Sequence, residues 1–275
     1  MQNNLFSLQG KVVVITGASG LLGRQHADAI AASGGIPVLL DLNQSILDTQ
    51  VIEIKEKYSV DARGYAVNIT DEKSIEANSQ IIVKTYGKID ALVNNAANNP
   101  KVENSSKVNF SRLENFPLAV WEQDVAVGLT GSFLCAKYYG YLISKNPDGG
   151  SIINISSDLG IIAPDQRLYK VDGLPEDQQP VKPVTYSIVK AGIIGLTRYL
   201  ATYWANKNVR CNAICPGGVE NNQNEAFIEE VIKRIPMNRM ARLDEYQGLL
   251  VFLLSEASSY MNGSIISADG GRSVW

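Results

Sequence analysis

Short apolar runs alternate with amphipathic stretches along most of the chain. Residues 11–15 (KVVVI) form a β-branched run that leads through a glycine-rich turn into a helical pattern over 24–34. Apolar runs bounded by turn residues predict buried strands, and longer periodic stretches predict helices. Further strands are expected over 36–41, 63–69, 90–96, 151–157, 209–217 and 264–270. Further helices are expected over about 45–58, 71–86, 121–145 and 186–206, and helical stretches around 225–255.

This alternation predicts an α/β fold. Strands joined through helices pair in parallel by right-handed crossovers, which place helices on both faces of the sheet. No fixed-period repeat divides the chain, so we expect residues 1–275 to form one domain, a Rossmann-type doubly wound parallel sheet. Two long loops, near 98–116 and 160–183, are inserted in the pattern, and loops of that length are often functional.

Composition narrows the choice of partner and compartment. The 275 residues are 45% hydrophobic and carry a net charge of -3, which argues against nucleic acid or an acidic membrane as the partner and favours a small polar molecule. The three cysteines and single histidine lack metal-ligand spacing, so no metal is expected. The chain begins without a signal-peptide pattern and has no long apolar span, which favours a cytoplasmic location and no membrane contact.

The turn after the first strand, TGASGLLG, predicts a nucleotide site. It spaces Gly17, Gly20 and Gly23 three residues apart, and such a turn lets the backbone and the next helix N-terminus approach a pyrophosphate. Asp41 closes the second strand, where a carboxylate would bind ribose hydroxyls and repel a 2′-phosphate. We therefore expect NAD rather than NADP, although Arg24 could favour NADP by turning toward a phosphate. A capping role for Asp41 is the structural alternative.

The stretch VTYSIVKAG places Tyr186 and Lys190 four positions apart, on one face of a predicted helix. A tyrosine has a pKa of about 10, and a neighbouring ammonium favours the phenolate and would make the tyrosine a better base. A surface tyrosine packed on a lysine stem is the structural alternative. Ser156 and Ser157 end a predicted central strand, at the edge where open α/β sheets bind ligands.

Five motifs in order carry a family resemblance. TGASGLLG, NNAA (94–97), SIINISSDLG, YSIVK and CPGGV (215–219) together resemble the classical short-chain dehydrogenase/reductase family, and the resemblance extends from Gly10 to Gly271. It implies an NAD(P)-dependent oxidoreductase acting on CH–OH groups by hydride transfer.

The resemblance also implies roles for individual residues. Tyr186 would be the general acid/base, Lys190 would lower its pKa and bind the ribose, and Ser157 would orient the substrate. Ser157 is preferred to Ser156 because it lies three residues before Gly160. The implied cofactor-binding residues are Gly17, Ser19, Gly20, Leu22, Gly23, Asp41, Leu42, Asn68, Ile69, Asn95, Ala96, Ala97, Tyr186, Lys190, Pro216, Gly217 and Val219.

The chain departs from the family pattern at several motif positions. Leu21 replaces a glycine of the turn, and Asn221 stands where a threonine is expected. Most consequential is Gly128, seven residues after Trp121, because the family has there an asparagine that helps to hold a water linking the lysine to solvent. The alternative function is therefore a non-catalytic NAD-binding or assembly protein.

The segment between Ser157 and Tyr186 is about double the family length and carries polar residues, among them Asp165 and Arg167. This indicates a polar substrate. APDQRLY and VGLTGSFLC resemble the flagellin-modification branch of the family, which implies a sugar or sugar phosphate. Two strongly apolar helices, near 128–144 and 192–205, correspond to helices that pair between subunits in the family, which implies a homodimer or homotetramer.

Overall fold

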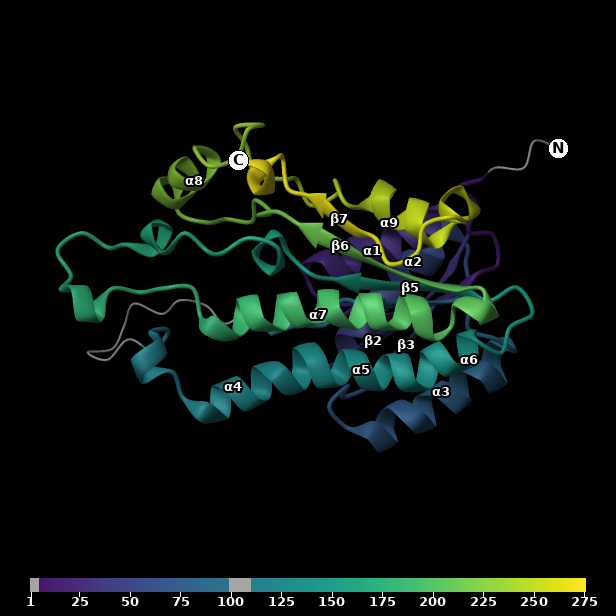
Figure 1. The fold of residues 1–275 in the computed structure, drawn as a ribbon. Coiled ribbons are helices and arrows are strands. Elements are labelled where there is room, and N and C mark those ends of the chain that lie inside the picture. Colours follow the sequence, from purple (N-terminus) through teal and green to yellow (C-terminus); the bar gives the residue numbers. More distant parts are fainter. Residues whose placement is uncertain (1–4, 99–109) are drawn as a thin grey trace.

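The computed structural model describes residues 5–98 and 110–275 and contains a seven-stranded sheet in this part of the chain (Figure 1). All neighbouring strands are parallel, in the order β3-β2-β1-β4-β5-β6-β7. The predicted α/β, doubly wound parallel fold is confirmed. The strands are β1 (Val12–Thr16), β2 (Ile36–Asp41), β3 (Arg63–Ala66), β4 (Ala91–Asn94), β5 (Gly150–Ile155), β6 (Val209–Pro216) and β7 (Ile265–Ala268).

Helices cover both faces of the sheet (Figure 1). One buried cluster lies between the sheet and the first group of helices, α1 (Leu21–Ala32), α2 (Gln44–Tyr58) and α9 (Gln247–Leu254). A second cluster lies between the sheet and the other group. That group comprises α3 (Glu72–Tyr86), α4 (Leu118–Val125), α5 (Gly131–Cys135), α6 (Tyr141–Ile143) and α7 (Val184–Tyr203). Since both faces of the central strands are buried, β1, β2, β4, β5 and β6 are mostly apolar, whereas the edge strands β3 and β7 are partly exposed.

Three segments show detail that the sequence did not resolve. The helical stretches expected around 225–255 are two helices, α8 (Glu225–Ile232) and α9, and the chain between them turns at Pro236 and at Asn238, whose φ is 53°. The helix expected over 121–145 begins earlier, at Leu118, and α4, α5 and α6 are joined by π-helical turns over 126–130 and 136–140. The insertion near 160–183 contains short 3-10 turns, and 99–109 of the other predicted loop lie outside the described residues.

The strand order creates a crevice at the carboxyl ends of the central strands. β1 pairs with β2 on one side and with β4 on the other, so the chain leaves the middle of the sheet in two opposite directions. Open α/β sheets bind ligands at such a point. None of the helices in the described part of the chain combines the length and apolar character needed to span a membrane.

Candidate active site

A cleft of about 600 Å³ opens at this carboxyl edge. It is lined by every predicted cofactor residue except Gly23, and also by Ser156 and Ser157. The remaining lining residues were not predicted as site residues from the sequence. They come from strand ends, helices and the loop after β6, and are Leu21, Leu40, Val67, Asn98, Val127, Ile155, Asn221 and Gln223. Across the described ranges 5–98 and 110–275, no group of three or more acidic, histidine or cysteine side chains could hold a metal ion.

The glycine turn requires its glycines for steric reasons. Gly17 has a φ of 62°, and a Cβ atom there would lie 2.8 Å from the Cα atom of Ala96. A Cβ atom on Gly23 would lie 2.1 Å from the carbonyl oxygen of Gly17, so Gly23 packs behind the turn and does not line the cleft. Gly20 is the N-cap of α1. The turn thus brings bare backbone and a helix N-terminus to the cleft, which fits a dinucleotide pyrophosphate.

Asn95 and Thr16 fix this turn against β4. The Asn95 side-chain amide donates to the carbonyl oxygens of Thr16 and Gly17, each at 3.0 Å, while the Thr16 hydroxyl oxygen accepts from the backbone amides of Asn95 and Ala96. Both N–H groups of the Asn95 side-chain amide are therefore hydrogen-bonded within the protein. Its contribution to the cleft is to hold the turn in place.

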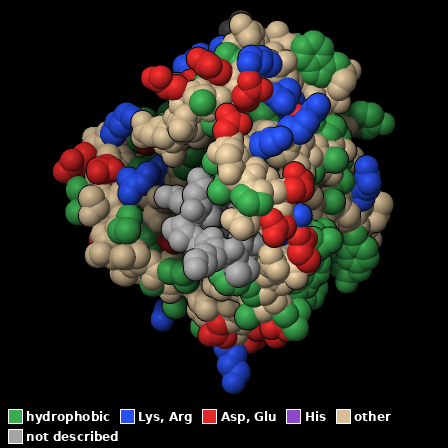
Figure 2. Space-filling model, turned by 90° about the vertical axis from the view of Figure 1, so that its left-hand side faces the viewer, with side chains coloured by type: hydrophobic (Ala, Val, Ile, Leu, Met, Phe, Trp, Pro, Cys, Tyr) green, Lys and Arg blue, Asp and Glu red, His purple; other side chains and the backbone are tan. Residues whose placement is uncertain are grey.

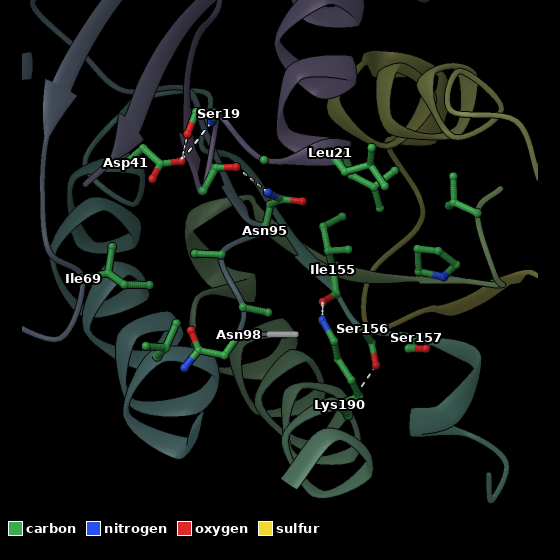
Figure 3. A pocket seen from close by; sticks show the side chains of 18 of the residues that line it. Ser19, Leu21, Asp41, Ile69, Asn95, Asn98, Ile155, Ser156, Ser157 and Lys190 are labelled. Carbon is green, nitrogen blue, oxygen red and sulfur yellow. Dashed lines mark hydrogen bonds between the residues drawn. The ribbon is translucent and has the colours of Figure 1, made fainter. Parts of the chain in front are cut away.

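Asp41 faces the glycine turn from the end of β2 (Figure 3). One carboxylate oxygen accepts from the Ser19 amide at 2.9 Å and from the Ser19 hydroxyl at 2.5 Å, and the other accepts from the Leu42 amide at 2.8 Å. Arg24, the residue that could have favoured a phosphate, donates to the Ser19 carbonyl oxygen at 3.2 Å, lies 3.9 Å from Glu53 and does not line the cleft. Asp41 is thus the charged side chain that the second strand presents to the cleft.

Lys190 projects from α7 into the cleft and is buried. Its Nζ donates to the carbonyl oxygen of Ile155 at 2.9 Å (Figure 3), and burial lowers the pKa of Lys190 to about 8. Nζ lies 5.9 Å from the centre of the Tyr186 ring, so the two residues do share one face of the helix. This juxtaposition is the one predicted from their spacing.

Tyr186 does not have the lowered pKa expected from an adjacent ammonium. In the protein chain alone, burial raises the pKa of Tyr186, and its hydrogen bond with Ser157 opposes this only in part. A second cation from the insertion, Lys182, lies with its Nζ 3.8 Å from the Tyr186 ring centre, and burial lowers the pKa of Lys182 to about 8. The sequence spacing predicted that Tyr186 and Lys190 lie together, but it did not predict that burial raises the pKa of Tyr186.

The two serines after β5 have different surroundings. The Ser156 hydroxyl is buried and donates to the Lys190 carbonyl oxygen at 2.7 Å. The Ser157 hydroxyl donates to Asp158 Oδ1 at 2.8 Å and accepts from the Leu159 amide at 3.2 Å. Of the two serines, Ser157 is the one whose side chain lowers the pKa of Tyr186.

The polar side chains of the insertion mostly serve its own folding. Asp165 accepts from Arg167 at 2.8 Å and from Arg234, just after α8, at 2.7 Å, and the Tyr169 ring packs 6.0 Å from that of Phe227. None of these residues lines the cleft. The expectation that this polar set faces the substrate is therefore not met by Asp165 and Arg167: Asp165 pairs with Arg234, after α8, and Arg167 pairs with Asp165.

Gly128 lies against α7 with no space for a side chain. A Cβ atom there would be 2.3 Å from Cγ1 of Val189, the residue before Lys190. Polar groups lie one helical turn earlier: Asp124 is buried and contacts Asn98 and Thr185. Sequence reasoning missed these three residues. The available signal was that Asp124 precedes Gly128 by four positions and so lies on the same helix face.

Comparison with known proteins leads to the family that the sequence motifs resemble. Residues 11–169 match the family model described as short chain dehydrogenase, and residues 177–273 match the model described as Enoyl-(Acyl carrier protein) reductase. The chain is 32% identical over 268 residues to a 3-oxoacyl-(acyl-carrier-protein) reductase FabG of Aquifex aeolicus, covering 96% of this chain and 98% of that protein. It is 33% identical over 276 residues to an NADP-dependent mannitol dehydrogenase of Hypocrea jecorina, covering 98% and 94%.

A solved structure has the same architecture. NAD+-bound xylitol dehydrogenase superposes with a TM-score of 0.81 at 26% identity, over 96% of this chain and 99% of that one. The matched segments include the glycine turn, the serine strand and the Tyr186 helix, which are the elements that form the cleft. The chain therefore belongs to the short-chain dehydrogenase family and is an oxidoreductase that acts on an alcohol or ketone.

Proposed function

We propose that the protein is an NAD-dependent oxidoreductase that interconverts a secondary alcohol and a ketone on a small polar substrate, a sugar or sugar phosphate. The observation that carries this proposal is the convergence of Ser157, Tyr186 and Lys190 on the cleft that the glycine turn borders. A hydroxyl, a phenol and a buried cation beside a nucleotide site are the groups that carbonyl reduction requires.

Each of the three side chains has a role that follows from its position. Tyr186 takes the proton of the substrate hydroxyl in oxidation and returns it to the carbonyl oxygen in reduction. Ser157 binds the same oxygen, and Lys190 supplies positive charge that stabilises the developing phenolate. Bound nicotinamide would supply or accept the hydride at the carbinol carbon. Ser157 and Lys190 are buried, which strengthens the electrostatic interactions within this group.

The preference for NAD rests on Asp41. Its carboxylate stands at the end of β2, hydrogen-bonded to Ser19 and Leu42, where a ribose 2′-phosphate would meet a negative charge. Relatives use both cofactors: the mannitol dehydrogenase is named NADP-dependent, whereas the xylitol dehydrogenase structure contains NAD+. The other cofactor residues proposed are those predicted from the sequence.

The polar substrate is supported by the sugar-alcohol relatives, mannitol and xylitol dehydrogenases. Acidic and basic side chains are interspersed over the face that carries the insertion and α8 (Figure 2), so that face offers no single-sign field. Assignment to the flagellin-modification branch stays a prediction.

We also propose a cytoplasmic homodimer or homotetramer. The outer surfaces of α5–α7 expose large aromatic side chains: Phe133, Tyr141, Tyr199 and Tyr203 are each at least half exposed. The rings of Tyr199 and Tyr203 stack at 5.5 Å on the surface of α7. Exposed apolar clusters of this kind are typical of subunit contacts.

The experiment that tests the function combines binding and turnover. Purified protein is titrated with NADH and NADPH by fluorescence and then assayed against a panel of polyols, keto-sugars and sugar phosphates, with apolar alcohols for comparison. Turnover that is confined to the polar panel and lost in Tyr186→Phe, with NADH still bound, is the expected result. Activity on apolar alcohols alone would contradict the proposed substrate, and binding without any turnover would contradict the proposed activity.

A further inference from the structure

A second, much smaller cavity adjoins the cleft behind Lys190. Its volume is about 10 Å³, close to the ~10–15 Å³ that one water molecule requires. Asn98, Tyr186 and Lys190 line both this cavity and the large cleft. In Figure 3, Asn98 and Ser157 lie on opposite sides of Lys190. The small cavity therefore lies at the lysine end of the proposed catalytic group.

The far wall of this cavity is polar and buried. The Asp124 side chain, only 7% exposed, accepts from the Asn98 amide at 3.1 Å through Oδ1 and from the Thr185 hydroxyl at 2.5 Å through Oδ2. A carboxylate has about four lone-pair sites, so these two bonds leave it able to accept more. A buried carboxylate that faces a water-sized space has a strong preference for a further donor.

Lys190 supplies that donor from the opposite wall. An ammonium has three N–H groups, and among residues 5–98 and 110–275 Nζ has one hydrogen-bond acceptor, the carbonyl oxygen of Ile155. A water in the small cavity could accept from Nζ and donate to Asp124, with the Asn98 carbonyl oxygen as a further acceptor. Two to four polar partners are what a buried water needs.

We infer that Asp124, positioned by Asn98 and Thr185, holds a water on Lys190 and that this water carries protons between the active site and solvent. This inference rests on the proposed function. In oxidation, Tyr186 takes the proton of the substrate hydroxyl, and the proton then passes by way of Lys190 and this water to solvent. In reduction, a proton follows the same path from solvent to Tyr186. No oxidant or reductant beyond the hydride acceptor is involved, and Asp124 is a positioning residue.

The packing at Gly128 explains why the polar group lies at position 124. Val189 occupies the space that a side chain at position 128 would need. Asp124 lies one helical turn earlier on the same face of α4, and its carboxylate reaches the cavity that Val189 also lines. In this chain Gly128 stands at the place of the family asparagine, and the buried acid, Asp124, lies one turn earlier.

A crystal structure of the NAD complex, for the wild type and for Asp124→Asn, tests the inference without requiring turnover. The expected result is an ordered water within hydrogen-bond distance of both Lys190 Nζ and the Asp124 carboxylate, displaced or less ordered in the variant. A dry cavity, or a direct bond between Lys190 and Asp124, overturns the inference. If the wild type proves inactive on every substrate, the proposed function fails while this result still decides the water.

Kinetics provide the second test, with the substrate found by the panel. Asp124→Asn keeps the shape of the side chain but removes its charge, and kcat is expected to fall by about 10-fold or more, with the acidic limb of the oxidation pH profile displaced to lower pH. Asp90→Asn is the matched control, because Asp90 is a partly buried aspartate at the amino end of β4 that accepts from the Val12 amide at 2.7 Å. An unchanged profile in Asp124→Asn overturns the relay.

A rescue variant separates a relay from a merely structural role. Gly128→Asn combined with Val189→Ala supplies an asparagine and removes the methyl groups that block it. Introduced into Asp124→Asn, this pair is expected to restore most of the lost kcat and the wild-type pH profile. Recovery of thermal stability without recovery of the pH profile would assign Asp124 to structure alone and overturn the inference.

Discussion

Arg272, in the last turn of the chain, forms a buried ion pair with Asp158, the residue directly after Ser157. Arg272 Nη1 donates to Asp158 Oδ2 at 2.8 Å, and the two side chains are 11% and 4% exposed. Asp158 Oδ1 accepts from the Ser157 hydroxyl at 2.8 Å. The orientation of the proposed substrate-binding serine is therefore set by a residue that lies beyond β7.

Breaking this pair is expected to cost both stability and activity. Arg272→Met leaves the Asp158 carboxylate buried without its cation, which should lower the free energy of unfolding by about 3–5 kcal/mol and raise KM for the substrate through a displaced Ser157. Chemical denaturation and initial-rate kinetics measure the two effects. Arg242→Met, which removes an exposed cation near Asp244, should change stability by less than about 1 kcal/mol. Equal effects of the two variants would contradict the role given to the buried pair.

Cofactor preference should shift when the charge at Asp41 is removed. In Asp41→Ser, the Ser19 and Leu42 amides lose their carboxylate acceptor and become able to donate to a phosphate, so the NADPH/NADH affinity ratio should rise about ten-fold, or about 1.4 kcal/mol. Fluorescence titration with both cofactors measures it. Asp61→Ser, at the amino end of β3, is the control and should leave the ratio unchanged. Preferential loss of NADPH binding in Asp41→Ser would refute the assignment.

Gly128 and Val189 should show a strong non-additive coupling. Gly128→Ala places a methyl group 2.3 Å from Val189 Cγ1, and a valine in a helix has little freedom to move aside, so the variant should lose about 1–3 kcal/mol of stability. Val189→Ala creates a small void by itself. The double variant should be more stable than the sum of the single changes predicts, by denaturant titration. Additive losses would mean that the two side chains do not compete for the same space.

Stability should depend on pH through Lys190. The folded protein releases the Lys190 proton near pH 8, whereas the ordinary lysine pKa is 10.5, so the unfolded chain binds more protons between these values and wild-type stability rises with pH across that window. Lys190→Met removes the buried charge and should raise Tm by roughly 2–4 °C at pH 7, with the difference shrinking toward pH 10. Thermal melts at several pH values measure it. A difference that grows with pH would contradict the lowered pKa.

The sequence predicted the architecture well because its evidence is local. The boundaries of β2 coincide with the expected 36–41, and β1 and β5 carry β-branched runs of their own. Ligands of a parallel sheet meet at the carboxyl ends of its strands, so placing the motifs on the strands was enough to bring Gly17, Ser157 and Tyr186 to one cleft.

What the sequence did not predict depends on contacts between distant residues. Asp165 could be taken as a substrate contact because its partner, Arg234, lies 69 positions away. The bonds from Asn98 and Thr185 to Asp124 span 26 and 61 positions, and no local pattern announces them. The pKa of Tyr186 was expected to fall because the cation was visible in the sequence, whereas the burial that raises it is a property of the folded chain.

The order of the strands separates the two halves of the site. β2 presents Asp41, β5 ends just before Ser157, and β1 and β4 lie between these two strands. Three strand spacings of about 4.8 Å therefore separate Asp41 from Ser157 by roughly 14 Å. Effects of mutations at sites farther apart than about 7–10 Å usually add. Cofactor choice and substrate choice are therefore separately evolvable in this fold: selection can exchange one while leaving the energetics of the other intact.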